Sequence, residues 1–251
     1  VIDAIAQSCD VFFYEIALKT GINNIAKISR EFGLGLPTGL NLPGEKGGLI
    51  PDRDWKLREK QTVWRPGETI IAGIGQGYVL VTPMQLALMT SRIANGGKKI
   101  IPTLIKSDGK ILNNFSNAAI SKDNLNIIKR AMESVTLDEF GTGRTFRLGN
   151  KGVEMAGKTG TVQVRRISTI ERESEEGVIK NEDRIWEWRD HALYVGYAPM
   201  EKPKYAISVI VEHGGSGSSK AGPIARDIME ATLQNDPTKF IPKNPIQKPI
   251  V

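Results

Sequence analysis

Residues 191–213 read HALYVGYAPMEKPKYAISVIVEH, in which two runs of β-branched and aromatic residues flank a short connection. Both runs, 191–198 and 205–213, have the composition of β-strands. The connection between them spans about six residues and contains Pro199 and Pro203. Because parallel strands need a longer, usually helical crossover, this stretch predicts an antiparallel pair.

A third strand is predicted upstream of this pair, from Gly152 to Val164. Apolar periodicity and end signals predict helices around the strands, over residues 1–20, 23–32, 83–96, 123–137 and 221–233. The first helix could equally break in two at residues 8–10, because Ser and Asp prefer cap positions. A hairpin is predicted over 100–112, and the proline- and glycine-rich segment 34–70 predicts a long irregular loop.

The composition is that of a folded, soluble protein. The chain has 251 residues, of which 40% are hydrophobic and 25% charged. Its longest apolar stretch, 69–81, is interrupted by glycines and is shorter than the roughly 20 residues of a membrane-spanning helix. The net charge of +6 comes without a basic cluster interleaved with aromatic residues, which weighs against nucleic-acid binding. The charged segment 165–190 predicts an exposed loop, and the proline-rich residues 236–251 predict an extended tail behind a domain of residues 1–235.

One motif points to a nucleotide site. Gly152, four residues, then Gly157, Lys158 and Thr159 match the phosphate-loop pattern letter for letter. That loop works only when a helix starts directly after the Lys, so that free backbone N–H groups face the phosphate. Here residues 160–164 alternate like a strand. A nucleoside triphosphatase is therefore the less favoured interpretation.

The same residues have a different meaning on a strand. Lys158 supplies a fixed positive charge, Gly160 allows a substrate backbone to approach, and Thr159 and Thr161 offer donors to a carboxylate. The tripeptide K-T-G belongs, together with S-x-x-K and S-D-N, to the signature of serine β-lactamases and penicillin-binding proteins. The sequence Ser-Cys-Asp at residues 8–10 takes the place of S-D-N.

Longer stretches strengthen this resemblance: SCDVFFYEIA at 8–17, GIGQGYVLVTPMQLALMTSRIANGG at 73–97, GKTGTVQV at 157–164, RDHALYVGYAP at 189–199 and VEHGGSGSSKAGPIARDIM at 211–229. Over nearly its whole length the chain resembles class B penicillin-binding proteins of the elongation-specific type. The resemblance implies an α/β fold of the α+β type, the serine β-lactamase/transpeptidase-like fold. Its mostly antiparallel sheet would be flanked by helices, with the N-terminal part of the domain missing from this chain.

The resemblance also implies the chemistry of the site. The intact enzyme would cross-link peptidoglycan by acyl transfer from the D-Ala-D-Ala end of a stem peptide, and β-lactams would imitate that dipeptide. Ser8 would relay a proton to the leaving amine, and Asp10 would orient the substrate or the catalytic lysine. Lys158 would attract the terminal carboxylate and favour loss of the proton. Thr159 and Thr161 would hydrogen-bond that carboxylate, and the Thr161 backbone N–H would form half of an oxyanion hole.

The nucleophile motif S-x-x-K should precede Ser8, yet only seven residues do so. An S-x-x-K match at residues 107–110 follows the second motif and contains a predicted hairpin turn, so we interpret it as coincidental. The chain is therefore expected to be inactive alone, with an unfilled edge where the missing segment would pack. A non-catalytic interaction module on the same scaffold is the alternative.

Cys9 is the single cysteine of the chain. Its place in the apolar stripe of the first helix predicts a buried, inert thiol. The resemblance instead implies one ligand of a structural zinc, whose other ligands would lie upstream, while catalysis would need no cofactor. His191 and His213 are expected to be hydrogen-bonded or exposed. The parent protein would face the periplasm at the inner membrane, through an anchor outside this chain, and would contact membrane proteins of the elongation machinery.

Overall fold

The computed structural model describes residues 1–40, 42–105, 115–149, 154–165, 169–174 and 177–236. Three strands form one antiparallel sheet in the order β1-β2-β3. They are β1 (Ala156–Val162), β2 (His191–Ala198) and β3 (Tyr205–Val211). Thr159 pairs with Tyr194, which pairs in turn with Val209. The predicted antiparallel pair and the third strand are confirmed.

Nine α-helices are described: α1 (Ile2–Ala6), α2 (Asp10–Thr20), α3 (Ile22–Glu31), α4 (Arg53–Lys60), α5 (Pro66–Gly73), α6 (Pro83–Ala94), α7 (Lys122–Leu137), α8 (Thr169–Glu173) and α9 (Gly222–Gln234). Shorter turns are η1 (Arg144–Phe146), η2 (Asn181–Asp183), η3 (Trp186–Trp188) and the π-turn η4 (Gly217–Ala221). The predicted first helix is two helices, broken at Ser8 and Cys9. None of the described helices has the length and apolar composition to cross a membrane.

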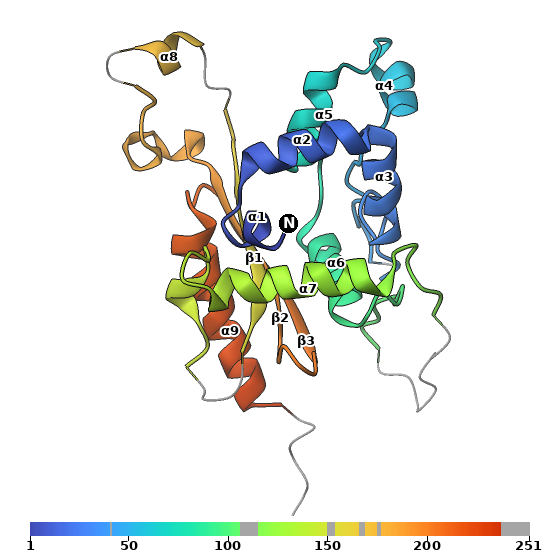
Figure 1. Ribbon diagram of the computed structural model, residues 1–251, viewed down its shortest axis with the longest axis vertical. Coiled ribbons are helices and arrows are strands. Elements are labelled where there is room, and N and C mark those ends of the chain that lie inside the picture. Colours follow the sequence, from blue (N-terminus) through green and yellow to red (C-terminus); the bar gives the residue numbers. More distant parts are fainter. Residues whose placement is uncertain (41, 106–114, 150–153, 166–168, 175–176, 237–251) are drawn as a thin grey trace, which may run out of the picture.

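Helices cover both faces of the sheet (Figure 1). On one face, α9 packs on Tyr194 and Phe146, whose rings meet edge to face at 5.2 Å. On the other face, α6 and α7 pack through Ala94 and Met132 against Tyr197. Large aromatic side chains contribute most of the apolar area that such a core removes from water. The sheet is therefore the shared centre of a helix–sheet–helix arrangement.

The prediction of irregular structure over 34–70 is wrong, since α4 lies within that segment and α5 begins in it. Asp52 caps α4 by accepting a hydrogen bond from the Trp55 backbone N–H at 2.8 Å. Pro66 stands at the start of α5, where its fixed φ suits a helix and its missing N–H has no intrahelical partner to lose. Pro66 was therefore counted as a helix breaker although it begins a helix.

The described residues of the segment 165–190 have more regular structure than an exposed loop. It contains α8, η2 and η3, and Arg184 is buried in an ion pair with Asp190 at 3.2 Å. Trp186 and Trp188 are exposed, as the prediction requires. Asp236, the first residue of the predicted tail, is also buried and pairs with Lys204 at 2.8 Å. The remainder of the tail and the turn of the predicted 100–112 hairpin lie outside the described residues.

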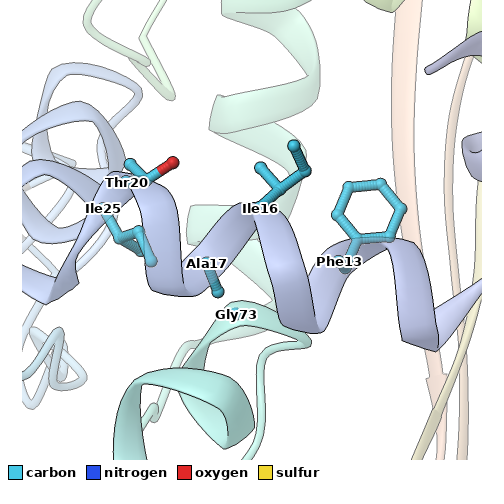
Figure 2. Close-up of a pocket in the computed structure, with 6 residues that line it drawn as sticks. All are labelled: Phe13, Ile16, Ala17, Thr20, Ile25 and Gly73. Carbon is cyan, nitrogen blue, oxygen red and sulfur yellow. The ribbon is translucent and has the colours of Figure 1, made fainter. Parts of the chain in front are cut away.

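The helix α2 crosses α5 at a close contact (Figure 1). A Cβ atom on Gly73 would lie 2.4 Å from the Cβ of Ala17, so only glycine permits this approach. Figure 2 shows Ala17 pointing toward Gly73, beside a shallow hollow that Phe13, Ile16 and Ile25 also line. This contact joins the C-terminal half of α2 to the end of α5. The turn before α2 and the turn after α5 each reach β1 through a side chain.

Candidate active site

The turn between α1 and α2 carries the Ser-Cys-Asp motif. The Ser8 N–H donates to the Ile5 carbonyl at 3.2 Å, and the Cys9 N–H donates to the Ala4 carbonyl at 2.8 Å. This pair of bonds is the Schellman pattern that ends many helices, with a left-handed residue after the cap. Ser8 occupies the left-handed position, at φ 56°. Glycine is the usual residue there, because a Cβ makes that backbone conformation unfavourable.

The hydroxyl of Ser8 meets the K-T-G strand. The Lys158 ammonium donates to Ser8 Oγ at 2.9 Å and to the Thr159 carbonyl at 2.6 Å. Burial lowers the pKa of Lys158 to about 8, and the negative charge of Asp10 partly opposes that shift. A lysine with such a pKa holds or releases a proton near neutral pH. The structure thus places the Ser8 hydroxyl against Lys158, with the charge of Asp10 close enough to act on that lysine.

Asp10 acts on this lysine through its charge. It begins α2, in the first helical turn, where a carboxylate is favoured by the positive end of the helix dipole. Its position one residue beyond the turn is what brings its charge close to Lys158.

Alternation along β1 divides the motif between the two faces of the sheet. Lys158 lies on the α7 face, and Thr159 and Thr161 lie on the other. Thr159 is buried, and its hydroxyl is hydrogen-bonded to the hydroxyl of Thr142 at 2.9 Å. Thr161 is exposed. A Cβ on Gly160 would touch only the Cβ of Leu193, at an ordinary 3.4 Å, so its role toward a substrate stays a prediction.

Thr142 is a site residue that sequence reasoning missed. Its backbone N–H donates to the Ala6 carbonyl at 3.1 Å, while its hydroxyl meets Thr159. One residue therefore ties the end of α1 to the K-T-G strand. Its flanking glycines, in the sequence Gly-Thr-Gly at 141–143, were a local sign of tight backbone packing.

Gln76 is the second missed residue. It follows α5, and its side-chain amide donates to the Thr161 carbonyl at 3.1 Å. The residue stands in the GIGQG stretch that carries part of the family resemblance. Nothing local marks its target, since Thr161 lies 85 residues further along the chain.

The prediction that Cys9 is buried is wrong. Its thiol is exposed and not buried, because the break at Ser8 removes Cys9 from the helical stripe and makes it the N-cap of α2. In the described part of the chain, no group of three or more His, Cys, Asp or Glu residues could hold a metal ion. A structural site needs four ligands, so the described residues do not fit a zinc centre.

Three other sequence predictions concern the phosphate-loop pattern, the second S-x-x-K match and the two histidines. Lys158 and Thr159 lie inside β1 with strand on both sides, so the helix required by a phosphate loop is not there and the nucleotide interpretation is wrong. The S-x-x-K match at 107–110 falls outside the described residues. His191 accepts the His213 backbone N–H at 2.9 Å, and His213 Nδ1 bonds the Arg189 carbonyl at 2.9 Å, so both histidines are hydrogen-bonded as expected.

The contact between a Ser-x-Asp turn and a K-T-G strand brings together two of the three motifs that mark serine β-lactamases and penicillin-binding proteins. The family model described as the penicillin-binding protein transpeptidase domain matches residues 1–230. The chain therefore belongs to the penicillin-binding protein transpeptidase family.

Within this family the named relatives are of the MrdA, or penicillin-binding protein 2, type. The peptidoglycan D,D-transpeptidase MrdA of Haemophilus influenzae is 36% identical over 239 residues, which cover 92% of this chain and 36% of that protein. MrdA of Acinetobacter baumannii is 38% identical over 230 residues, which cover 88% of this chain and 33% of that protein. The chain thus spans about a third of the length of these curated relatives.

Solved structures support the same assignment. Helicobacter pylori PBP2 in its complex with MreC matches with a TM-score of 0.79 and 34% identity, covering 94% of this chain and 40% of that one. Pseudomonas aeruginosa PBP2 in complex with WCK 5153 matches with a TM-score of 0.78 and 36% identity, covering 94% of this chain and 49% of that one. The transpeptidase fold and the resemblance to penicillin-binding protein 2 are confirmed.

Proposed function

We propose that this chain supplies the Ser-x-Asp and K-T-G parts of a peptidoglycan D,D-transpeptidase site. The observation that carries the proposal is the 2.9 Å contact between Lys158 Nζ and Ser8 Oγ, two groups 150 residues apart. The relatives named D,D-transpeptidases support the reaction class. The substrate would be the D-Ala-D-Ala end of a stem peptide, with β-lactams as its mimics.

The geometry accounts for one proton path. Lys158 donates to Ser8 Oγ, which leaves the hydroxyl proton of Ser8 free to point toward a substrate. When the scissile amide breaks, the departing nitrogen takes the Ser8 proton, and Ser8 takes one from Lys158. A pKa of about 8 suits Lys158 to this exchange, because the best proton donors titrate near the working pH.

The substrate's terminal carboxylate would meet the positive charge of Lys158 and the exposed hydroxyl of Thr161. The Thr161 backbone N–H would stabilise the oxyanion of the tetrahedral intermediate. Thr159 would have a second role, since its hydroxyl already bonds Thr142 and fixes the strand against α1. The acyl group itself needs a serine nucleophile in an S-x-x-K motif, and no such motif precedes Ser8 in these 251 residues.

The relatives support a proposal for the partners and the location of the parent protein. A complex of Helicobacter pylori PBP2 with MreC is the support for elongation-machinery proteins as partners of the parent protein. A periplasmic site at the inner membrane is the place where such an enzyme meets its substrate. A structural zinc is still a hypothesis, because its other ligands would have to come from outside the described residues.

The test is reversible binding of diacetyl-L-Lys-D-Ala-D-Ala to the 251-residue chain, followed by NMR. We expect shifts at Ser8 and along 158–161, and loss of binding in Lys158→Met. Lys19→Met, an exposed lysine at the far end of α2, is the control and should bind normally. In the same samples a fluorescent penicillin should form no covalent adduct; an adduct on this chain would refute the predicted lack of activity.

A further inference from the structure

The strand β1 has a free edge. In the described residues it pairs with β2 on one side only. In an antiparallel ladder, successive residues direct their backbone groups alternately toward the neighbouring strand and away from it. The carbonyls of Thr159 and Thr161 are the ones that point away, since side chains reach both of them. An extended peptide could add to this edge as a further strand.

Side chains of the protein already donate hydrogen bonds to those two carbonyls. Lys158 Nζ bonds the Thr159 carbonyl at 2.6 Å, and the Gln76 amide bonds the Thr161 carbonyl at 3.1 Å. The Lys158 contact comes from the strand itself. The Gln76 contact comes from a separate element, the turn after α5, so it spans the space that an added peptide would enter.

The turn holds the Gln76 backbone independently of its side chain. The Gln76 N–H donates to the Ile71 carbonyl at 3.1 Å, and the Gly75 N–H donates to the Ala72 carbonyl at 3.0 Å. Gly73 in turn anchors the end of α5 on α2. The Gln76 side chain is half-buried and carries three rotatable bonds beyond this fixed backbone. It can leave Thr161 without any change in the fold.

We propose that Gln76 is a positioning residue that holds, in the free protein, the place of the incoming peptide's amide at the Thr161 carbonyl. The inference rests on the proposed function. A ligand with an N–H opposite Thr161 displaces the Gln76 amide and makes the same bond. A ligand without that N–H leaves Gln76 in place. Gln76 therefore competes with acyl donors that carry an amide at this position and does not compete with donors that lack it.

The test compares three peptides: diacetyl-L-Lys-D-Ala-D-Ala and two depsipeptides, each with one of its two backbone amides replaced by an ester. In Gln76→Ala the Thr161 carbonyl is open, so the parent peptide should bind about fivefold tighter, the equivalent of one ordinary hydrogen bond. One of the two depsipeptides should lose this gain. Gln234→Ala, an exposed glutamine at the end of α9, is the control and should change nothing.

NMR of the wild-type chain gives the second readout. The Gln76 side-chain NH₂ signals should move when the parent peptide binds and stay in place with the depsipeptide that lacks the critical N–H. Equal or weaker binding of the parent peptide by Gln76→Ala, or equal tightening for all three peptides, overturns the inference and shows that Gln76 only protects the strand edge.

The proposed function fails separately. If the wild-type chain binds the parent peptide and Lys158→Met does not, the function stands whatever Gln76→Ala does. If neither the wild-type chain nor Gln76→Ala binds any of the three peptides, the proposed function and the inference both fall.

Discussion

The turns that end α1 and α5 have the same pair of hydrogen bonds, yet they deliver a functional side chain from different positions. After α5, Gly75 takes the left-handed position at φ 77°, and the next residue, Gln76, reaches β1. After α1, Ser8 takes the left-handed position at φ 56° and itself reaches β1. The helices α3 and α6 also end with glycine at the left-handed position, at Gly33 and Gly96.

The difference shows where function overrides conformational preference. A glycine at position 8 would relieve the backbone, but it has no hydroxyl to accept a hydrogen bond from Lys158. An L-residue in the left-handed region costs about 1–2 kcal/mol. Strain of this kind persists only where surrounding structure holds it, and it is concentrated at functional sites. The turn after α5 avoids the strain because its functional residue comes one position later.

A large effect is expected where α2 and α5 meet. In Gly73→Ala the new Cβ would lie 2.4 Å from the Cβ of Ala17, so α2 and α5 must move apart. Overpacking of this type should lower the free energy of unfolding by about 1–3 kcal/mol, measured by urea denaturation. Gly67→Ala in the same helix is the control, because its Cβ would contact nothing within 4 Å. A loss as small as that of the control would show that the helices accommodate the added methyl group at this contact.

The turn after α5 should depend on glycine for backbone reasons alone. A Cβ on Gly75 would contact nothing within 4 Å, but its φ of 77° is unfavourable for alanine. Gly75→Ala should therefore lower the free energy of unfolding by about 1 kcal/mol, again by urea denaturation. An unchanged stability would mean that the turn rearranges, and the Gln76 signal in the NMR spectrum would then shift as well.

In the turn after α1, glycine should be the favourable substitution. Ser8→Gly and Ser8→Ala both lose the hydroxyl, but only glycine relieves the left-handed backbone. We expect Ser8→Gly to be more stable than Ser8→Ala by about 1 kcal/mol in the same denaturation assay. Both variants should lose the contact with Lys158 equally. Equal stability of the two variants would contradict the assignment of strain to Ser8.

A further effect concerns pH. The pKa of Lys158 is lowered from its ordinary 10.5 to about 8 by burial. Between these two values the unfolded chain binds a proton that the folded chain lacks, so stability should rise as pH rises from about 8 to 10.5. Lys158→Met should flatten this slope. A slope equal to that of the wild type in this variant would assign the titration to another group.

Asp10 provides the sharper form of that experiment. Its charge raises the pKa of Lys158, so Asp10→Asn should move the Lys158 titration, followed by NMR at Nζ, to lower pH. Asp3→Asn, on the exposed first turn of α1, is the control. An unshifted titration in Asp10→Asn would remove Asp10 from the electrostatics of the site.

Several parts of the fold were predictable because their signals are local. The strands follow from runs of β-branched residues, and the ends of α3 and α6 follow from glycines at the left-handed position. The K-T-G strand and the Ser-Cys-Asp motif were recognisable for the same reason. The helix α5 was missed because Pro66 was weighed as a breaker, although a proline at a helix start is favourable. Burial of Cys9 was predicted from a helical stripe that the turn at Ser8 interrupts.

The amino-acid sequence alone is sufficient to assign the residue types of the site, their order and the family, because these depend on neighbours a few positions apart. Three hydrogen bonds connect residues that lie 17 to 150 positions apart in the sequence. They join Ser8 to Lys158, Thr142 to Thr159, and the Gln76 amide to the Thr161 carbonyl. The same is true of the lowered pKa of Lys158, which comes from its burial. Packing of α2 against α5 and of α1 against α7 brings these segments together. No local pattern encodes a distance between segments that meet only after folding.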